Sequence, residues 1–362
     1  MPFKIIGFFA RISDIIIVMK ITKEKLLRLS DSYIAQRSRK DRSIVCAYLT
    51  GSILREYPFI NNTTDVDIIM IHSDLPQAYR EISGISEEAT FDIYHYPRSY
   101  FANTRNLRTD PWVGSSLCYD PIVLFGKGHW YEFVLSSVEA SFFLPENAMQ
   151  RALVFNRESH KYYAQLQRLV NTQFEVSYIF NYILCLENAV NSVACLYRRP
   201  LTMRHFLQDF IECCNELNCI NLVSEIISLL TENQNLEQHY QYYSQYWNYY
   251  LDYFSNYVNA GFFPEYSKVR LPYYQKAVEA YWETHLPSAV WIMLNTWTHM
   301  FSAMNMEQNE GFHSFLGMNG LTPQQGPKRL EILDHFLEQV DDTIDSWGKS
   351  HGLEDGTSIY IE

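Results

Sequence analysis

The order of hydrophobic and polar positions divides this chain into two halves with different patterns. In the first half, apolar side chains at helical spacing alternate with short apolar runs that are typical of strands. This order predicts a small mixed β-sheet with helices on one face. The elements expected are a helix over 23–39, strands over 43–50, 66–72 and 89–96, a short helix over 75–84, and a strand or loop over 117–125.

From about residue 145 onward the periodicity is helical only. Pro287 falls inside one apolar stretch and should end or kink that helix. The polar, Gly- and Pro-containing segment 305–326 is expected to be a loop. This half is therefore expected to be a helical bundle with short loops. Its expected helices cover 147–170, 174–197, 203–217, 220–230, 236–258, 273–304 and 329–347.

Together the two patterns predict the α+β fold class, with three parts along the chain. The N-terminal run over 3–21 is apolar, but Arg11 and Asp14 interrupt it, and it is short for a membrane span. We expect residues 1–18 to be an overextended start before Met19 or a short ordered arm, and we expect no membrane anchor. The three parts are an arm over 1–22, a sheet domain over 23–144 and an α-helical bundle domain over 145–362.

Composition narrows the class of protein. Hydrophobic residues make up 47% of the chain, which excludes a disordered or fibrous protein. The formal net charge is −12, and because nucleic-acid binding needs clustered Lys and Arg, broad nucleic-acid binding is not expected. Such a charge suits a cationic ligand. The seven cysteines show no CxxC spacing, so we expect reduced thiols and a cytoplasmic protein.

Two short polar motifs stand where the predicted strands end and begin. Gly51 and Ser52 close the first strand, and Asp65 and Asp67 open the second. Residues two apart in a strand point to one side, so the two carboxylates project together and repel one another. A divalent cation removes that repulsion, and Mg²⁺ prefers such oxygen ligands beside substrate phosphates. Because a Gly-Ser turn offers backbone N–H groups and a hydroxyl to a phosphate, the pattern predicts metal-dependent phosphoryl or nucleotidyl transfer.

The Gly51-Ser52 pair and the Asp65-x-Asp67 pair resemble the signature of the DNA polymerase β-like nucleotidyltransferase superfamily. The segment over 43–125 is most similar to its small bacterial members, such as the aminoglycoside adenylyltransferases. The resemblance implies a nucleotidyltransferase domain in which Asp65 and Asp67 hold Mg²⁺ or Mn²⁺. Gly51 and Ser52 would bind the nucleotide. It also implies transfer of an NMP, with ATP the commonest donor, to an acceptor hydroxyl with release of pyrophosphate.

Four further residues complete the site that the resemblance implies. Asp92, in a strand-like run, is the candidate third carboxylate, either as a metal ligand or as the base for the acceptor proton. Glu187, in an apolar helix, is similar to the base that kanamycin nucleotidyltransferase-like enzymes supply from their helical domain, and burial would raise its pKa. Arg199 and Arg204, near a helix junction, are candidate nucleotide-binding residues that would reach the triphosphate.

Each of these residues also has a purely structural alternative. Asp65 and Asp67 could follow a polar turn into an ordinary edge strand, and Asp92 could mark the solvent face of an antiparallel strand. Ser52 could cap a short helix, and Glu187 could lie on the polar edge of an amphipathic helix. The two arginines could belong to a solvated helix end.

Three functions stay open at this level. The first is nucleotidyl transfer to an antibiotic, a protein hydroxyl or a tRNA end; a homodimer is open too, because some relatives build the site across a dimer. The second is a toxin–antitoxin component whose helical half is a ribonuclease-like HEPN module, since Arg199 and His205 match the Arg-x(4–6)-His count. The third is a non-catalytic relative that binds a nucleotide or a protein. The pair of metal-type carboxylates favours the first.

Overall fold

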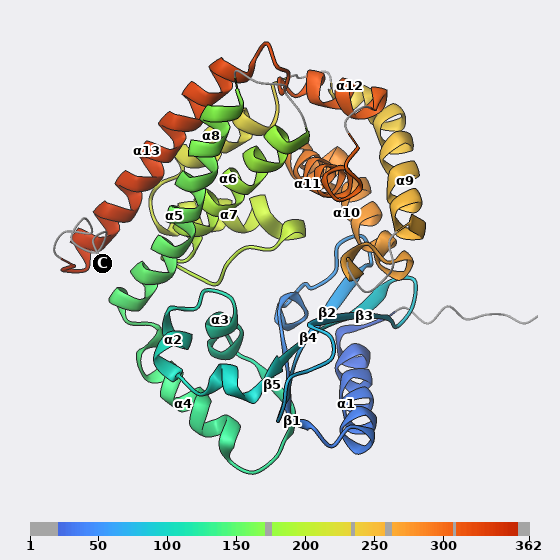
Figure 1. Ribbon diagram of the computed structural model, residues 1–362, viewed down its shortest axis with the longest axis vertical. Helices are drawn as coiled ribbons and strands as arrows, with labels where there is room; N and C mark the ends of the chain where they lie inside the picture. Colours follow the sequence, from blue (N-terminus) through green and yellow to red (C-terminus); the bar gives the residue numbers. More distant parts are fainter. Residues whose placement is uncertain (1–20, 171–175, 233–235, 258–262, 307–308, 354–362) are drawn as a thin grey trace, which may run out of the picture.

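The structure is a computed structural model that describes residues 21–170, 176–232, 236–257, 263–306 and 309–353 (Figure 1). The expected N-terminal arm lies outside the described residues, except for Ile21 and Thr22. We call residues 21–144 the sheet half and residues 145–353 the helical half. In Figure 1 the strands gather at one end of the molecule, and the helices of the helical half lie at the other.

A five-stranded mixed sheet forms the centre of the sheet half. Its strands are β1 (Ile44–Thr50), β2 (Thr64–His72), β3 (Arg80–Gly84), β4 (Ala89–Pro97) and β5 (Ile122–Gly126). They lie in the order β3-β4-β2-β1-β5, so β2 is the central strand. β2 and β4 are parallel, and the other neighbouring pairs are antiparallel. The expected mixed sheet and its strands over 43–50, 66–72 and 89–96 are therefore confirmed.

Helices cover both faces of this sheet. They are α1 (Lys23–Lys40), α2 (Thr104–Thr109), α3 (Val113–Cys118) and α4 (Trp130–Phe142). On β2, Ile68 belongs to the apolar cluster that includes α1, whereas Ile69 belongs to the cluster that includes α2, α3 and α4. The expectation of helices on one face is therefore wrong. Both alternating sets of β2 side chains include apolar residues, and a strand of that kind is buried on both faces.

Two short segments differ from the sequence prediction. Residues 75–84, expected to form a helix, instead end in strand β3, which pairs antiparallel with β4. The open edge of the sheet offers backbone hydrogen bonds that outweigh the helix-start signal of Pro76. Residues 305–326, expected to form a loop, contain helix α12 (Glu310–Met318), because the Asn309 side chain caps its first turn.

The helical half has the all-helical pattern expected from its sequence. Its remaining helices are α5 (Pro145–Leu169), α6 (Val176–Ala194), α7 (Phe206–Glu216), α8 (Asn221–Leu230), α9 (Tyr240–Tyr257), α10 (Leu271–Thr284), α11 (Leu286–Met304) and α13 (Gly326–Ser350). Pro287 lies in the first turn of α11, which confirms the break expected there. Trp247, Trp291 and Trp297 are fully buried in one apolar core shared by these helices.

Arginine side chains connect the two halves. Arg55 of the sheet half binds both carboxylate oxygens of Asp209 on α7, with one nitrogen 2.8 Å from Oδ1. Arg204 donates to the backbone carbonyl of Thr63 at 3.0 Å, just before β2 begins. The division into two separate domains at residues 144 and 145 stays a prediction, although α5 does begin at that position.

Two further features bear on the sequence analysis. All seven cysteines are buried and free, which agrees with the expected reduced thiols. Among the described residues, no helix combines the length and the apolar character that crossing a bilayer requires. A cytoplasmic location stays a prediction.

Candidate metal and nucleotide site

Three carboxylates meet on one face of the sheet. Asp67 lies directly beside Asp92 in the parallel register of β2 and β4, and Asp65 lies two residues earlier on the same face of β2. Oxygen atoms of all three lie within 4.8 Å of one another, so together they can hold a metal ion. Asp92 is only 1% exposed, which excludes the solvent-face alternative. Because β2 is paired on both sides, the edge-strand alternative for Asp65 and Asp67 is wrong as well.

The turn after β1 is shaped by the absence of a side chain at Gly51. Its φ of +81° falls in a region that favours glycine, and a Cβ atom there would lie 1.8 Å from Oδ2 of Asp67. The next residue, Ser52, begins a 3₁₀ turn (Ser52–Leu54) and donates its hydroxyl to Asp65 at 3.2 Å. That bond orients a carboxylate instead of capping the turn, so the capping alternative for Ser52 is wrong. Gly51 and Ser52 therefore form one wall of the carboxylate cluster.

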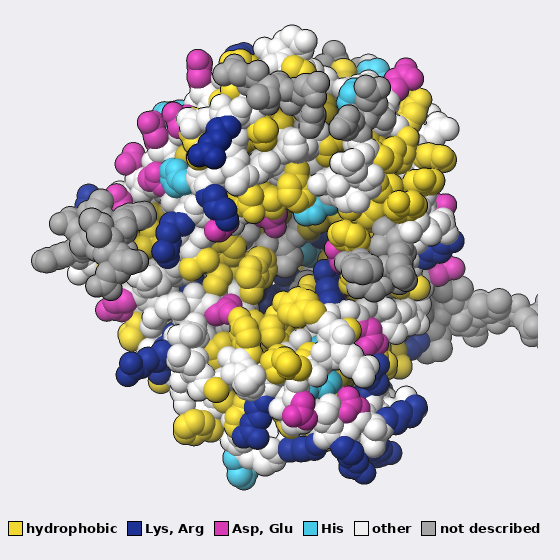
Figure 2. Space-filling view, in the orientation of Figure 1, with side chains coloured by type: hydrophobic (Ala, Val, Ile, Leu, Met, Phe, Trp, Pro, Cys, Tyr) yellow, Lys and Arg dark blue, Asp and Glu magenta, His cyan; other side chains and the backbone are white. Residues whose placement is uncertain are grey.

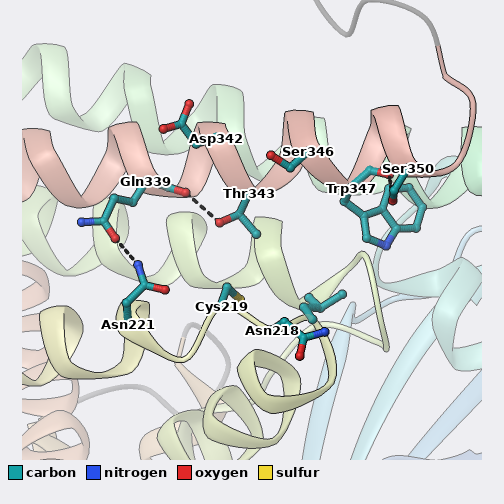
Figure 3. A pocket seen from close by; sticks show the side chains of 10 residues that line it. Asn218, Cys219, Asn221, Gln339, Asp342, Thr343, Ser346, Trp347 and Ser350 are labelled. Atoms are coloured by element: carbon teal, nitrogen blue, oxygen red, sulfur yellow. Dashed lines mark hydrogen bonds between the residues drawn. The ribbon is translucent and has the colours of Figure 1, made fainter.

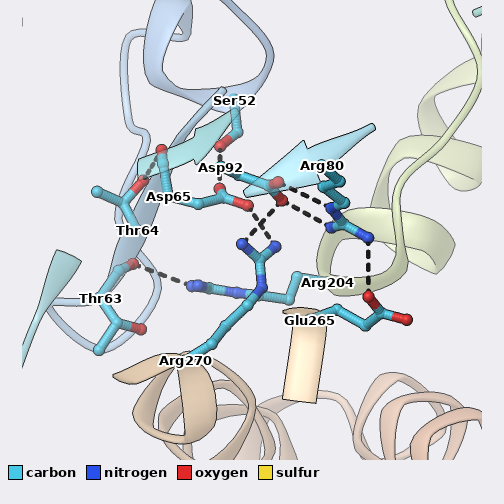
Figure 4. A network of polar contacts seen from close by, with 9 residues as sticks. All are labelled: Ser52, Thr63, Thr64, Asp65, Arg80, Asp92, Arg204, Glu265 and Arg270. Atoms are coloured by element: carbon cyan, nitrogen blue, oxygen red, sulfur yellow. Dashed lines mark hydrogen bonds and ion pairs between the residues drawn. The ribbon is translucent and has the colours of Figure 1, made fainter. Parts of the chain in front are cut away.

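Two arginines that sequence reasoning missed bind the same carboxylates (Figure 4). Arg270 precedes α10, and its Nη2 lies 2.8 Å from Asp65 while its Nη1 lies 2.9 Å from Asp92. Arg80, the first residue of β3, donates to both oxygens of Asp92 at 2.9 and 2.7 Å and also pairs with Glu265. Arg80 could have been found from the sequence if 80–84 had been assigned to a strand. Arg270 follows Asp65 by 205 residues, and no local signal joins them.

The electrostatic environments of the carboxylates differ. Burial alone would raise the pKa of Asp65, but Arg270 and Arg204 hold it below its usual value. Burial, with Asp65 and Asp92 as like-charged neighbours, raises the pKa of Asp67 well above its usual range. Among the described residues, Asp67 also has no hydrogen-bond or ion-pair partner. Asp67 is therefore the member of the cluster that lacks a cation.

A pocket of about 760 Å³ opens beside this cluster. Gly51, Asp67 and Arg199 are among the residues that line it. Aromatic side chains form much of the rest, namely Tyr79, Tyr94, Tyr96, Tyr100 and Trp112. Figure 2 shows hydrophobic side chains gathered over the middle of the molecule, where the two halves meet. The pocket thus joins groups that suit phosphate and metal to a wall on which a planar group can stack.

Arg199 and Arg204 occupy different positions. Arg199 lines the pocket and donates to the Gly51 carbonyl at 3.2 Å, but it forms no ion pair with any described carboxylate. Burial and the neighbouring cations Arg55 and Arg198 lower its pKa, so Arg199 is a cation that lacks an anion. Since α6 ends at residue 194, the helix-end alternative does not fit it. Arg204 is buried against the segment before β2 and does not line the pocket.

Glu187 on α6 is half-buried, and burial raises its pKa to about 7. No described residue donates a hydrogen bond to its carboxylate. The buried hydroxyl of Tyr266 lies within electrostatic reach of both Glu187 and Arg80. The raised pKa of Glu187 suits a general base near neutral pH, but Glu187 is not among the residues that line the pocket and has no direct bond to the carboxylate cluster.

A second pocket, of about 410 Å³, lies between the start of α8 and the last turns of α13 (Figure 3). Asp342 is the one charged side chain among the residues that line it, and it is exposed. Asn221 and Gln339 are bonded to each other across this groove. The second pocket lacks the convergence of charged groups found at the first.

Comparison with known proteins gives no further guide. No protein-family model matches this chain, and no curated protein matches it either. The resemblance to the nucleotidyltransferase superfamily therefore rests on the Gly51-Ser52 and Asp65-x-Asp67 motifs and on the geometry around them.

Proposed function

We propose that this protein is a Mg²⁺-dependent nucleotidyltransferase that transfers an NMP from an NTP, with ATP the first candidate, to an acceptor hydroxyl. One observation carries the proposal: Asp65, Asp67 and Asp92 meet on adjacent parallel strands, against a glycine turn that has no room for a side chain. The donor set consists of oxygen atoms only, which suits Mg²⁺ or Mn²⁺. The adjoining pocket, lined by Arg199 and by several aromatic rings, supports a nucleotide as the ligand.

Each group has a defined task in this proposal. Asp65 and Asp67 would hold the metal ion, which would neutralise charge on the phosphates and stabilise the leaving oxygen. The Gly51 turn and Arg199 position the triphosphate. The acceptor oxygen forms a bond to the α-phosphorus, the bond from that phosphorus to the β-bridging oxygen breaks, and pyrophosphate leaves.

The acceptor proton needs a base. Both oxygens of Asp92 are engaged by Arg80, and one of them also by Arg270, so Asp92 is poorly placed to accept it. Glu187 has no hydrogen-bond partner among the described residues, and its pKa of about 7 matches proton transfer at neutral pH. We therefore assign the base to Glu187 and a metal-binding or structural role to Asp92.

The test is a thermal-shift titration with each of the four NTPs, with and without Mg²⁺. We expect one NTP to raise the melting temperature of the wild type only when Mg²⁺ is present, and we expect Asp67→Asn to lose that rise. Asp342→Asn, in the second pocket, is the matched control and should respond like the wild type. Equal responses of Asp67→Asn and the wild type would remove Asp67 from the donor site.

A binding-only relative is the competing candidate, and one observation favours it. Arg80 and Arg270 already neutralise Asp65 and Asp92 without a metal ion. Stabilisation by an NTP that is the same with and without Mg²⁺, and no release of pyrophosphate, would select this candidate. No observation favours the ribonuclease-like alternative, because Arg199 contacts Gly51 and His205 lies in a separate 3₁₀ turn (Met203–His205).

A further inference from the structure

The guanidinium of Arg270 lies between two of the three carboxylates that could hold a metal ion. It is buried, and it bridges two of the three carboxylates at 2.8 Å from Asp65 and 2.9 Å from Asp92 (Figure 4). Oxygen atoms of the three carboxylates are within 4.8 Å of one another. A group that bridges two of them therefore takes up the space that a shared ion needs.

Arg270 is held at the carboxylates by charge attraction, because its guanidinium lacks a full set of hydrogen bonds. Its Nε atom is buried without a hydrogen-bond partner among the described residues, and its Nη1 atom contacts Asp92 as an ion pair without hydrogen-bond geometry. Its guanidinium lies 4.3 Å from the centre of the Tyr273 ring, and Arg204 lies 3.9 Å from the same ring centre. Two cations on one ring repel one another, so a stronger cation at the carboxylates can displace Arg270.

The formal charges point the same way. With all three carboxylates ionised, as metal binding requires, Asp65, Asp67 and Asp92 (−3) and the guanidinium groups of Arg80 and Arg270 (+2) sum to −1. A divalent ion added beside both arginines would make the buried cluster +1. A divalent ion in place of Arg270 makes it neutral, which is the least costly state for a buried group of charges.

We propose that Arg270 is the internal counterion of the carboxylate cluster, and that Arg270 and a divalent cation exclude one another from it. In the metal-free protein Arg270 stabilises Asp65 and Asp92. When a divalent cation binds, Arg270 leaves both carboxylates.

A buried guanidinium without an anion is unfavourable, so the released Arg270 needs a new partner. The phosphates of an incoming nucleotide supply one, and a guanidinium binds phosphate through two parallel hydrogen bonds. The metal ion should therefore bind weakly alone and strongly together with a nucleotide. This last step rests on the proposed function, whereas the competition between Arg270 and the metal ion does not.

The experiment measures binding of Mn²⁺ alone to the full chain, from the electron paramagnetic resonance signal of the free ion. We expect Arg270→Met to bind Mn²⁺ at least tenfold more tightly than the wild type. Arg270→Lys keeps the charge but cannot bridge two carboxylates, so its affinity should lie between the two. Arg105→Met, which removes an exposed arginine of α2, is the control for net charge and should match the wild type.

Adding Asp67→Asn to Arg270→Met should abolish the gained affinity, which places the ion at the cluster. If Arg270→Met and Arg270→Lys both bind Mn²⁺ with wild-type affinity, Arg270 is not a competitor and the inference is overturned. If the arginine variants show the expected order but no NTP stabilises the protein, the competition holds and the proposed function fails. The two ideas can thus fail separately.

Discussion

Gly51 and Asp67 form the closest approach in the candidate site. The Oδ2 atom of Asp67 lies where the Cβ atom of any other residue at position 51 would be. Gly51, with its positive φ, and the Asp67 carboxylate, which lacks a partner among the described residues, are therefore in direct contact. Strain and unpaired charge of this kind are kept where a ligand compensates for them, and they reduce the stability of the ligand-free protein.

Gly51→Ala tests this close approach. The added methyl group collides with Asp67 and the backbone is strained, so we expect a loss of about 2–4 kcal/mol in the free energy of unfolding. We also expect loss of any Mg²⁺-dependent stabilisation by an NTP. Gly128→Ala is the control, because Gly128 also has positive φ but no atom lies within 4 Å of its Cβ position. Urea unfolding of both variants provides the measurement, and equal losses would mean that the contact with Asp67 is unimportant.

A second prediction at this scale concerns the charge of Asp67. Its pKa is raised in the folded protein, so folding opposes its ionisation, and the carboxylate lowers stability at neutral pH. Asp67→Asn should therefore stabilise the metal-free protein by about 1–3 kcal/mol at pH 7.5. The gain should shrink as the pH falls toward 4, where the unfolded chain also binds the proton. Urea unfolding in EDTA checks this, and a destabilised variant would show that Asp67 makes a favourable contact.

The sequence indicates the site residues that are close in the chain. Asp65, Asp67 and Gly51 lie within one strand-turn-strand segment, so their spacing alone predicts that they meet. Asp92 depends on the pairing of β2 with β4, which needs the correct sheet order. Arg270 comes from the helical half, 205 residues after Asp65, and neither periodicity nor spacing connects the two. Long-range contacts of this kind are set by tertiary packing, not by local pattern.

At the scale of elements, the predictions are correct where the hydrophobic periodicity extends over several turns and wrong where the segment is short. Long amphipathic helices such as α5 and α13 were predicted because their apolar face repeats over several turns. The helix predicted over 75–84 is wrong, because the five residues of β3 carry little periodicity at a sheet edge and their pairing with β4 decides their conformation. The loop predicted over 305–326 is wrong at α12. This nine-residue helix begins at an Asn cap inside a polar segment, so its apolar periodicity is too short to indicate a helix.

Helix α11 carries a prediction about pH. His299 packs against Phe180 with ring centroids 4.9 Å apart, and burial lowers its pKa to about 4 from an ordinary value of 6.5. Between pH 6.5 and 4, His299 is protonated in the unfolded chain but neutral in the folded protein. The free energy of unfolding therefore falls as the pH drops through this range. The loss should reach up to about 3 kcal/mol.

Urea unfolding at several pH values between 7 and 4.5 measures this loss. His299→Gln should flatten the pH dependence, because the side chain no longer titrates. His129→Gln, at an exposed position, should leave the slope unchanged. A wild-type slope that survives in His299→Gln would mean that other groups cause the acid sensitivity.

At the scale of the whole molecule, arginine side chains make several of the polar contacts that join the two halves. Arg55 binds Asp209, Arg204 binds the Thr63 carbonyl, and Arg199 binds the Gly51 carbonyl. Each of these bonds lies near the candidate site. Loss of one partner should therefore disturb both the stability of the molecule and the site itself.

Asp209→Asn tests the joint between the halves. Arg55 and Arg198 would lose their buried partner, and we expect a loss of about 3–5 kcal/mol in the free energy of unfolding. Glu212→Gln is the matched control: it removes the exposed partner of Arg198 and should change stability by about 0–1 kcal/mol. Calorimetry of both variants makes the comparison. Similar melting temperatures for the two would show that the pair does not hold the halves together.

The position of Arg270 has a consequence for a fragment of the chain. A polypeptide cut after residue 144 would keep Asp65, Asp67, Asp92 and Arg80, but it would lose Arg270. Its three carboxylates would then face one guanidinium, and their repulsion would oppose folding. Millimolar calcium or magnesium would take the place of the missing arginine. The isolated sheet half should therefore fold as an ion-dependent unit, whereas the full-length chain folds without added salt of either metal.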